Sequence, residues 1–178
     1  MEVYWTQGNA AVFESETADI NSRQNFGWGT RIQVRCHRGG GSAELVQYRF
    51  WAHIPLANIG EIPRPPAGPG GAEVIARKVL VLWTANAPIA HLVKVDLWDG
   101  AYRRSQIVPN ADNSDIADRH KNSQPGKNEW EIAPTFHVKS ALGVSLHFEV
   151  TDDVEITLIA AGIWVEVLEP RTLLAPVR

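Results

Sequence analysis

Residues 44–54 read Glu-Leu-Val-Gln-Tyr-Arg-Phe-Trp-Ala-His-Ile, the clearest strand pattern in this chain. Successive side chains of a β-strand point to opposite faces, so every second residue shares a face. One face is apolar and is expected in the core: Val46, Tyr48, Phe50, Ala52 and Ile54. The other face is expected toward solvent or a partner: Gln47, Arg49, Trp51 and His53.

Working outward, similar short patterns recur along the chain and are separated by glycine, proline and polar turns. Further strands are expected at residues 30–36, 78–85, 91–98, 102–108, 130–138, 144–150 and 155–168. In residues 91–98 the inward set is Val93, Val95 and Leu97. Residues 78–85 are apolar on both faces, so something should cover Leu80 and Leu82. A parity switch near residues 160–162 indicates a β-bulge at Gly162.

Helical periodicity is nearly absent, so we predict an all-β fold. About eight to ten short strands at regular spacing are typical of an antiparallel two-sheet β-sandwich of the jelly-roll type. The 178 residues are expected to form one domain, residues 1–178. Within it we expect a surface crossover at residues 62–71, rich in proline and glycine, and a long polar loop at residues 109–128.

The composition limits the classes of partner that the protein is expected to bind and the compartment in which it is expected. The net charge is −3 and no basic stripe is present, which argues against a nucleic-acid partner. No run approaches the ~18 apolar residues of a membrane helix, so no membrane partner is expected. Cys36 is the only cysteine, and residues 1–5 lack the features of a signal peptide. We therefore expect a cytoplasmic protein, while export without a signal peptide stays open.

Several motifs occur in a characteristic order: Trp5 with Gly8-Asn9, Gly27-Trp28-Gly29-Thr30, Phe50 to Pro55, Val79 to Thr84, Val93 to Gly100, Asn128 to Trp130, Leu142 to Leu146 and Ala160 to Gly162. In this order the chain resembles a family of uncharacterised bacterial β-sandwich proteins of similar length. The resemblance covers roughly residues 5–167 and implies a β-sandwich fold. That family carries no established activity, so the resemblance leaves function open.

The seven tryptophans carry the main functional hypothesis, because an indole can either fill the core or stack on a ligand. Two of them, Trp51 and Trp98, have outward parity. If strands 44–54 and 91–98 are neighbours, one sheet face presents these indoles among polar groups. The candidate ligand-binding residues are Arg49, Trp51, His53, Lys94, Asp96 and Trp98. Such a platform suits a saccharide, although a covering loop or subunit explains the same rings.

Two metal sites are weaker candidates. His137 and His147 face each other if residues 130–138 and 144–150 form a hairpin, and Glu149 lies on the same face. A His-His-carboxylate group suits zinc or iron, but a one-residue slip in register separates the histidines. Asp112, Asp115 and Asp118 supply oxygen ligands that suit calcium, although their spacing is not that of a known calcium loop. Solvated turn residues are the alternative.

Catalytic motifs are mostly missing. Ser145 follows Gly143 but lacks the second glycine and the following helix of a nucleophile elbow. We therefore expect a non-catalytic binding or assembly protein that needs no cofactor and recognises a saccharide or another small ligand. One alternative is a small enzyme that uses a divalent metal ion at the histidine pair. Another is a homo-oligomeric structural protein, which the two-sided apolar strand at Leu80 and Leu82 favours.

Overall fold

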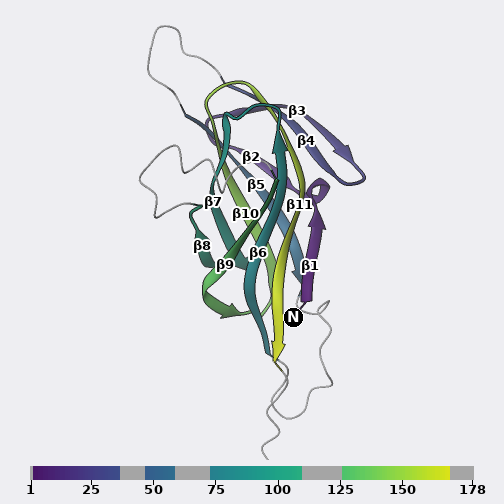
Figure 1. Ribbon diagram of the computed structural model, residues 1–178, viewed down its shortest axis with the longest axis vertical. Helices are drawn as coiled ribbons and strands as arrows, with labels where there is room; N and C mark the ends of the chain where they lie inside the picture. The colour runs from purple at the N-terminus through teal and green to yellow at the C-terminus, as the bar shows by residue number, and fades with distance from the viewer. Residues whose placement is uncertain (1, 37–46, 59–72, 110–125, 169–178) are drawn as a thin grey trace, which may run out of the picture.

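The structure is a computed structural model that describes residues 2–36, 47–58, 73–109 and 126–168. In these segments the chain forms eleven strands and one short 3₁₀ helix (Figure 1). The elements are β1 (Glu2–Gln7), η1 (Gly8–Ala10), β2 (Val12–Ser15), β3 (Asp19–Phe26), β4 (Gly29–Arg35), β5 (Tyr48–Asn58), β6 (Glu73–Ala85), β7 (Ala90–Asp99), β8 (Tyr102–Ile107), β9 (Gly126–His137), β10 (Ala141–Val150) and β11 (Val154–Leu168).

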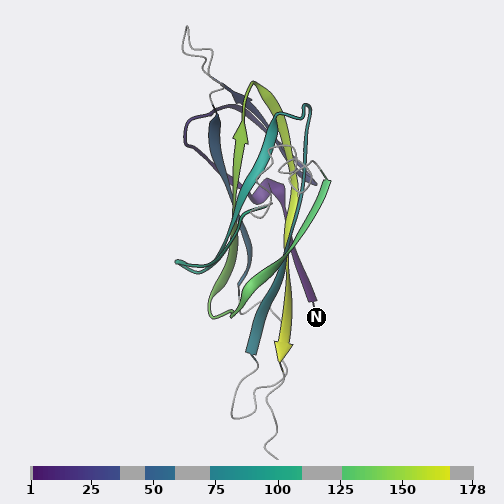
Figure 2. The ribbon, with the colours of Figure 1, turned by 60° about the vertical axis from the view of Figure 1, so that its left-hand side comes forward.

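The strands form two antiparallel sheets that pack face to face (Figure 2). The six-stranded sheet has the order β3-β4-β11-β6-β9, and β1 also pairs with β11. The five-stranded sheet has the order β2-β5-β10-β7-β8. The all-β, two-sheet prediction is therefore confirmed. In the part of the chain that the structure describes, no helix is long and apolar enough to cross a membrane.

The inner faces of the two sheets share one hydrophobic core. Trp83 of β6 is fully buried and meets Phe148 of β10 edge-on, with ring centroids 5.2 Å apart. Phe148 in turn stacks on Phe50 of β5 at 5.1 Å. The described members of the predicted inward faces of β5 and β6 are buried, as expected: Tyr48, Phe50, Ala52, Ile54, Val79, Val81 and Trp83. Val46, also predicted to point inward, lies outside the described residues. The aromatic contacts thus join the sheets at their centre.

The predicted inward set of β7 needs one correction. Val95 and Leu97 are fully buried, but Val93 is only partly buried. The register shifts there, because His147 pairs with Lys94 whereas the next residue, Phe148, pairs with Leu92. Leu92 therefore enters the core in place of Val93. A β-bulge of this kind inserts one residue and reverses the parity of the strand beyond it.

The long strand β11 organises the six-stranded sheet. Its first half pairs with β4 and its second half pairs with β1 along the same edge, while β6 pairs with the opposite edge. The parity switch in β11 is confirmed, but the register shift lies at Ile159 rather than at Gly162. Gly162 instead faces Trp5, and a Cβ there would lie 2.7 Å from the Trp5 ring. Its small size, not a bulge, explains this glycine.

Glycine is also required where β11 changes partner from β4 to β1. A Cβ on Gly8 would lie 1.9 Å from the carbonyl oxygen of Leu158, and a Cβ on Gly29 would lie 2.6 Å from the same atom. Both contacts are with backbone, which cannot move aside as a side chain can. Close packing against the backbone of β11 therefore explains the glycines of the Gly8-Asn9 and Gly29-Thr30 motifs.

Other expectations about strand positions were incomplete. Residues 130–138 and 144–150 do not form a hairpin, because β9 pairs with β6 whereas β10 lies between β5 and β7. The final residues of the expected polar loop, 126–128, belong to β9. Residues 62–71 and 110–125 lie outside the described residues. On β6, Leu80 is 1% exposed on the outward side, and Leu82 is partly buried.

Candidate functional site

The candidate site lies on the outer face of the five-stranded sheet. Strands β5 and β7 are not neighbours, because β10 runs between them. Cross-strand pairing nevertheless places all six predicted ligand-binding residues on one face with the alternate residues of β10. The face consists of Arg49, Trp51 and His53 of β5, Ser145, His147 and Glu149 of β10, and Lys94, Asp96 and Trp98 of β7.

The indole of Trp51 is engaged by other side chains of this face. It stacks on the His147 imidazole across the ladder, with centroids 4.1 Å apart and an interplanar angle of 5°. The Lys94 ammonium lies 4.6 Å from the centre of the same ring, in cation–π range. A stacked imidazole and an ammonium already use the ring surface that a sugar would need. Trp51 is therefore poorly placed as the stacking platform that the sequence suggested.

The charged side chains of this face are engaged by contacts within the protein. Arg49 pairs with Glu149 across the β5–β10 ladder, with nitrogen and oxygen 2.9 Å apart. Asp96 is 3% exposed even though it has outward parity, and Arg103 of β8 lies 3.6 Å from its carboxylate. Three of the predicted polar contacts of a ligand, Arg49, Lys94 and Asp96, thus have protein partners.

His147 is 8% exposed, and its Nε2 lies 2.9 Å from the carboxylate of Glu16, just beyond β2. Burial lowers the pKa of His147 below its ordinary value, because desolvation disfavours the charged imidazolium. Lys94 and Arg49 act in the same direction, whereas the hydrogen bond to Glu16 opposes them. His147 therefore acts as a neutral, stacked component of the sheet.

Beside this stack lies an open hollow of about 410 Å³. It lies over the β5–β10–β7 ladder and is bordered by Val12 of β2 and by the turns that flank these strands. Its lining consists of Val12, His53, Ile54, Pro55, Trp98, Gly100, Ala141, Leu142, Gly143, Val144 and Ser145. No Asp, Glu, Lys or Arg belongs to this lining. Gly143 pairs with Trp98 and with Pro55, and a Cβ there would have only ordinary contacts.

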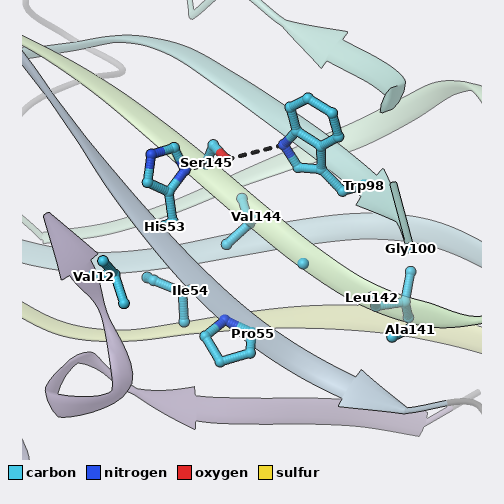
Figure 3. Close-up of a pocket in the computed structure, with 11 residues that line it drawn as sticks. Val12, His53, Ile54, Pro55, Trp98, Gly100, Ala141, Leu142, Val144 and Ser145 are labelled. Atoms are coloured by element: carbon cyan, nitrogen blue, oxygen red, sulfur yellow. Dashed lines mark hydrogen bonds between the residues drawn. The ribbon is translucent and has the colours of Figure 1, made fainter. Parts of the chain in front are cut away.

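At one end of the hollow, the side chains of Trp98, Ser145 and His53 form a chain of hydrogen bonds (Figure 3). The chain continues from His53 to a carboxylate of β2. The Trp98 indole Nε1–H donates to the Ser145 hydroxyl oxygen at 2.9 Å. The same oxygen lies 2.7 Å from Nδ1 of His53. Nε2 of His53 lies 3.2 Å from the carboxylate of Glu14 on β2. The figure shows His53 and Trp98 on either side of Ser145.

The order serine, histidine, carboxylate is that of a nucleophile triad, but the position of Ser145 does not suit a nucleophile. The Ser145 oxygen accepts a hydrogen bond from an indole. Ser145 lies in the interior of β10, paired on both sides, rather than on a strand-to-helix turn. Such an arrangement holds Trp98 and His53 in place, which is what a binding site requires.

The two predicted metal sites have different outcomes. His137 is on β9 in the six-stranded sheet and lies near Glu73, whereas His147 is on β10 in the other sheet. The prediction that they face each other is wrong, because the expected hairpin does not form. Within the described ranges, no cluster of three or more histidine, cysteine, aspartate or glutamate side chains could hold a metal ion. Asp112, Asp115 and Asp118 lie outside the described residues.

Several residues of this region were not predicted as site residues, among them Glu14, Glu16, Gly143, Ser145 and Val12. The signal for the two carboxylates is their spacing in residues 12–16, Val-Phe-Glu-Ser-Glu, which alternates as a short strand does. If the predicted strand at residues 144–150 is extended by one residue to Gly143, then Gly143 and Ser145 both point to its outward side. Their convergence on His53 and Trp98 depends on strand order, which alternation does not encode.

No protein-family model matches the chain, and no curated protein matches it.

Proposed function

We propose that this protein is a non-catalytic binding module that holds a saccharide or another small ligand in the hollow beside Trp98. One observation carries the proposal: a partly buried indole, held by a hydrogen bond to Ser145, forms a wall of an uncharged hollow. Ligand sites in proteins are typically hollows of about 300–1,000 Å³ that combine apolar walls with a few placed polar groups.

The chemistry of the lining supports a ligand with one apolar side and one polar side. Trp98, Val12 and Pro55 offer apolar surface, whereas Ser145 and His53 offer hydrogen-bonding groups at one end. A pyranose ring has this character, because its C–H groups and hydroxyl groups occupy different sides. The hydrogen bond from Trp98 fixes the indole before binding, which lowers the entropic cost of ordering it.

The other predicted residues have a supporting role in this proposal. Trp51, Lys94, Arg49 and Asp96 contact one another or neighbouring strands rather than the hollow. We assign them to the packing that positions β5, β10 and β7, and we place the ligand contacts at Trp98, His53 and Ser145. The site is therefore smaller than the sequence alone suggested, and it lies at one end of the predicted face.

The test uses the seven indole N–H signals of ¹⁵N-labelled protein, assigned by single Trp→Phe substitutions. A panel of methyl glycosides is titrated, and we expect the Trp98 signal to shift first. Trp98→Phe should weaken binding, while Trp28→Phe, a change in the other sheet, should leave it unaltered. A panel that moves no indole signal, or that moves only signals other than Trp98, contradicts the proposal.

A second candidate function, self-association, is favoured by the outer face of the six-stranded sheet. Trp5 is 46% exposed and Trp28 is 50% exposed, which is unusual for such large rings. Trp28 stacks on Phe26 at the tip of the β3–β4 hairpin, which extends from one end of the sandwich (Figure 1). Sedimentation velocity over a wide concentration range tests this proposal. A monomer at every concentration rejects it.

A further inference from the structure

We infer that the hollow selects uncharged ligands that donate a hydroxyl hydrogen bond to Ser145, and that it discriminates against carboxylate analogues of the same ligand. This inference rests on the proposed function and specifies its ligand class. It follows from the directions of three hydrogen bonds, two made by Ser145 and one between His53 and Glu14, because the atoms involved limit which of them can donate.

The first direction comes from Trp98. An indole Nε1–H can only donate, so the Ser145 oxygen accepts this hydrogen bond. A hydroxyl oxygen has two lone pairs, and this contact uses one of them. The Ser145 proton is still available for a second hydrogen bond.

The second direction comes from Glu14. An ionised carboxylate only accepts, so the hydrogen bond at 3.2 Å requires a proton on Nε2 of His53. In a neutral imidazole the other nitrogen is then an acceptor. Nδ1 of His53 therefore receives the Ser145 proton across the 2.7 Å contact. Glu14 in this way sets the tautomer of His53 and the orientation of the Ser145 hydroxyl.

What remains for a ligand is one lone pair on the Ser145 oxygen. Its proton is committed to His53 and its other lone pair to Trp98. A ligand hydroxyl can donate to this lone pair, whereas a ligand carboxylate would bring acceptor against acceptor. No Lys or Arg lines the hollow to offset the charge, and Glu14 adds negative charge beside it. Both effects favour a neutral, hydroxyl-bearing ligand.

The experiment compares matched ligands that differ in one group. Methyl glucoside and methyl galactoside are titrated against their uronic acid counterparts, in which a carboxylate replaces the primary alcohol, with the Trp98 indole signal as readout. We work at about pH 8, where free imidazole is neutral. We expect the neutral member of each pair to bind at least about tenfold more tightly. Ser145→Ala should weaken the neutral ligands by about fivefold.

Glu14→Gln provides the sharper variant, because an amide can donate as well as accept. It allows the other His53 tautomer, which releases the Ser145 proton toward the hollow. We expect the preference for the neutral ligand to fall by about fivefold or more. Glu16→Gln is the matched control: it removes the same charge near the same strand but contacts His147 instead of His53. It should leave the preference within about twofold.

A ligand-free measurement tests the hydrogen-bond chain directly. The ¹⁵N shifts of the His53 ring report its tautomer, and we expect the proton on Nε2 in the wild type. A proton on Nδ1 overturns the inference even if saccharides bind. Equal binding of the neutral and acidic members also overturns it, but leaves the proposed function intact. Binding of no member at all removes both.

Discussion

The indole of Trp5 on β1 lies over Gly162 on β11, its direct cross-strand partner. A Cβ added at Gly162 would lie 2.7 Å from Cε3 of the ring, closer than any ordinary contact. The ring thus covers a stretch of backbone that has no side chain of its own. An aromatic residue opposite a glycine is a known way to stabilise a strand that glycine weakens.

Gly162→Ala should destabilise the protein by about 1 kcal/mol, because the new methyl group displaces the Trp5 ring. In a Trp5→Ala background the same change should be neutral or stabilising, because alanine loses less backbone entropy than glycine. Urea unfolding of the four proteins of this double-mutant cycle measures the coupling. A second strand glycine, Gly143, is the control: Gly143→Ala meets only ordinary contacts and should not destabilise. Additive effects at Trp5 and Gly162 would contradict the contact.

Trp83→Ala should cost about 3–5 kcal/mol, because it removes a fully buried ring from the centre of the core. The loss includes the edge-on contact with Phe148, which connects the two sheets. Trp28→Ala, at a ring that is 50% exposed, should cost only about 1 kcal/mol. Thermal unfolding followed by far-ultraviolet circular dichroism measures both. Similar losses for the two variants would show that Trp83 is not central to stability.

Stability should fall as the pH drops through the ordinary titration range of histidine, and His147 should account for part of the loss. Its pKa is lowered in the folded state, chiefly by burial, so the unfolded chain binds a proton that the folded protein does not. Below the pKa that His147 has in the unfolded chain, proton binding to the unfolded chain lowers the free energy of unfolding. At higher pH neither state binds this proton, and the effect disappears. His147→Gln should reduce the pH dependence of the free energy of unfolding, measured in urea.

Gly143→Val should weaken ligand binding without destabilising the fold. A Cβ at this position would lie 3.6 Å from the Ile54 carbonyl oxygen and 4.0 Å from the Trp98 Cβ, so the backbone accepts it. The added methyl groups would occupy the hollow, and we expect binding of a neutral methyl glycoside to weaken by about tenfold or more. The glycoside titration and a thermal melt are read together. Unchanged affinity would place the ligand elsewhere.

The sequence predicted the strands better than their arrangement. Residues 48–54 show why: their alternation matches the inner and outer faces of β5 residue by residue. The short strands β2 and β3 were missed, since most of their residues are exposed and lack an apolar side. The predicted face of Val93 and the predicted position of the bulge in β11, which lies at Ile159, were wrong for another reason. A single inserted residue reverses which face every later residue of the strand occupies.

The candidate site shows the same division. Trp98 and His53 were predicted as outward residues near a ligand, and both line the hollow. Ser145 was interpreted as an ordinary outward strand residue, and its contacts with both of them could not be predicted. The pairing of His137 with His147 failed for the converse reason: two strands that follow each other in the chain belong to different sheets.

Period-two alternation is a local property, so the sequence by itself determined an all-β sandwich, most of its strands and many of the side chains that enter the core. Only the tertiary structure decided that β10 runs between β5 and β7 and that β2 flanks β5. The hydrogen bond between Ser145 and His53 spans 92 positions in the chain, and that between His53 and Glu14 spans 39. Contacts over such distances depend on how whole strands cross and pair, which no short window of sequence records.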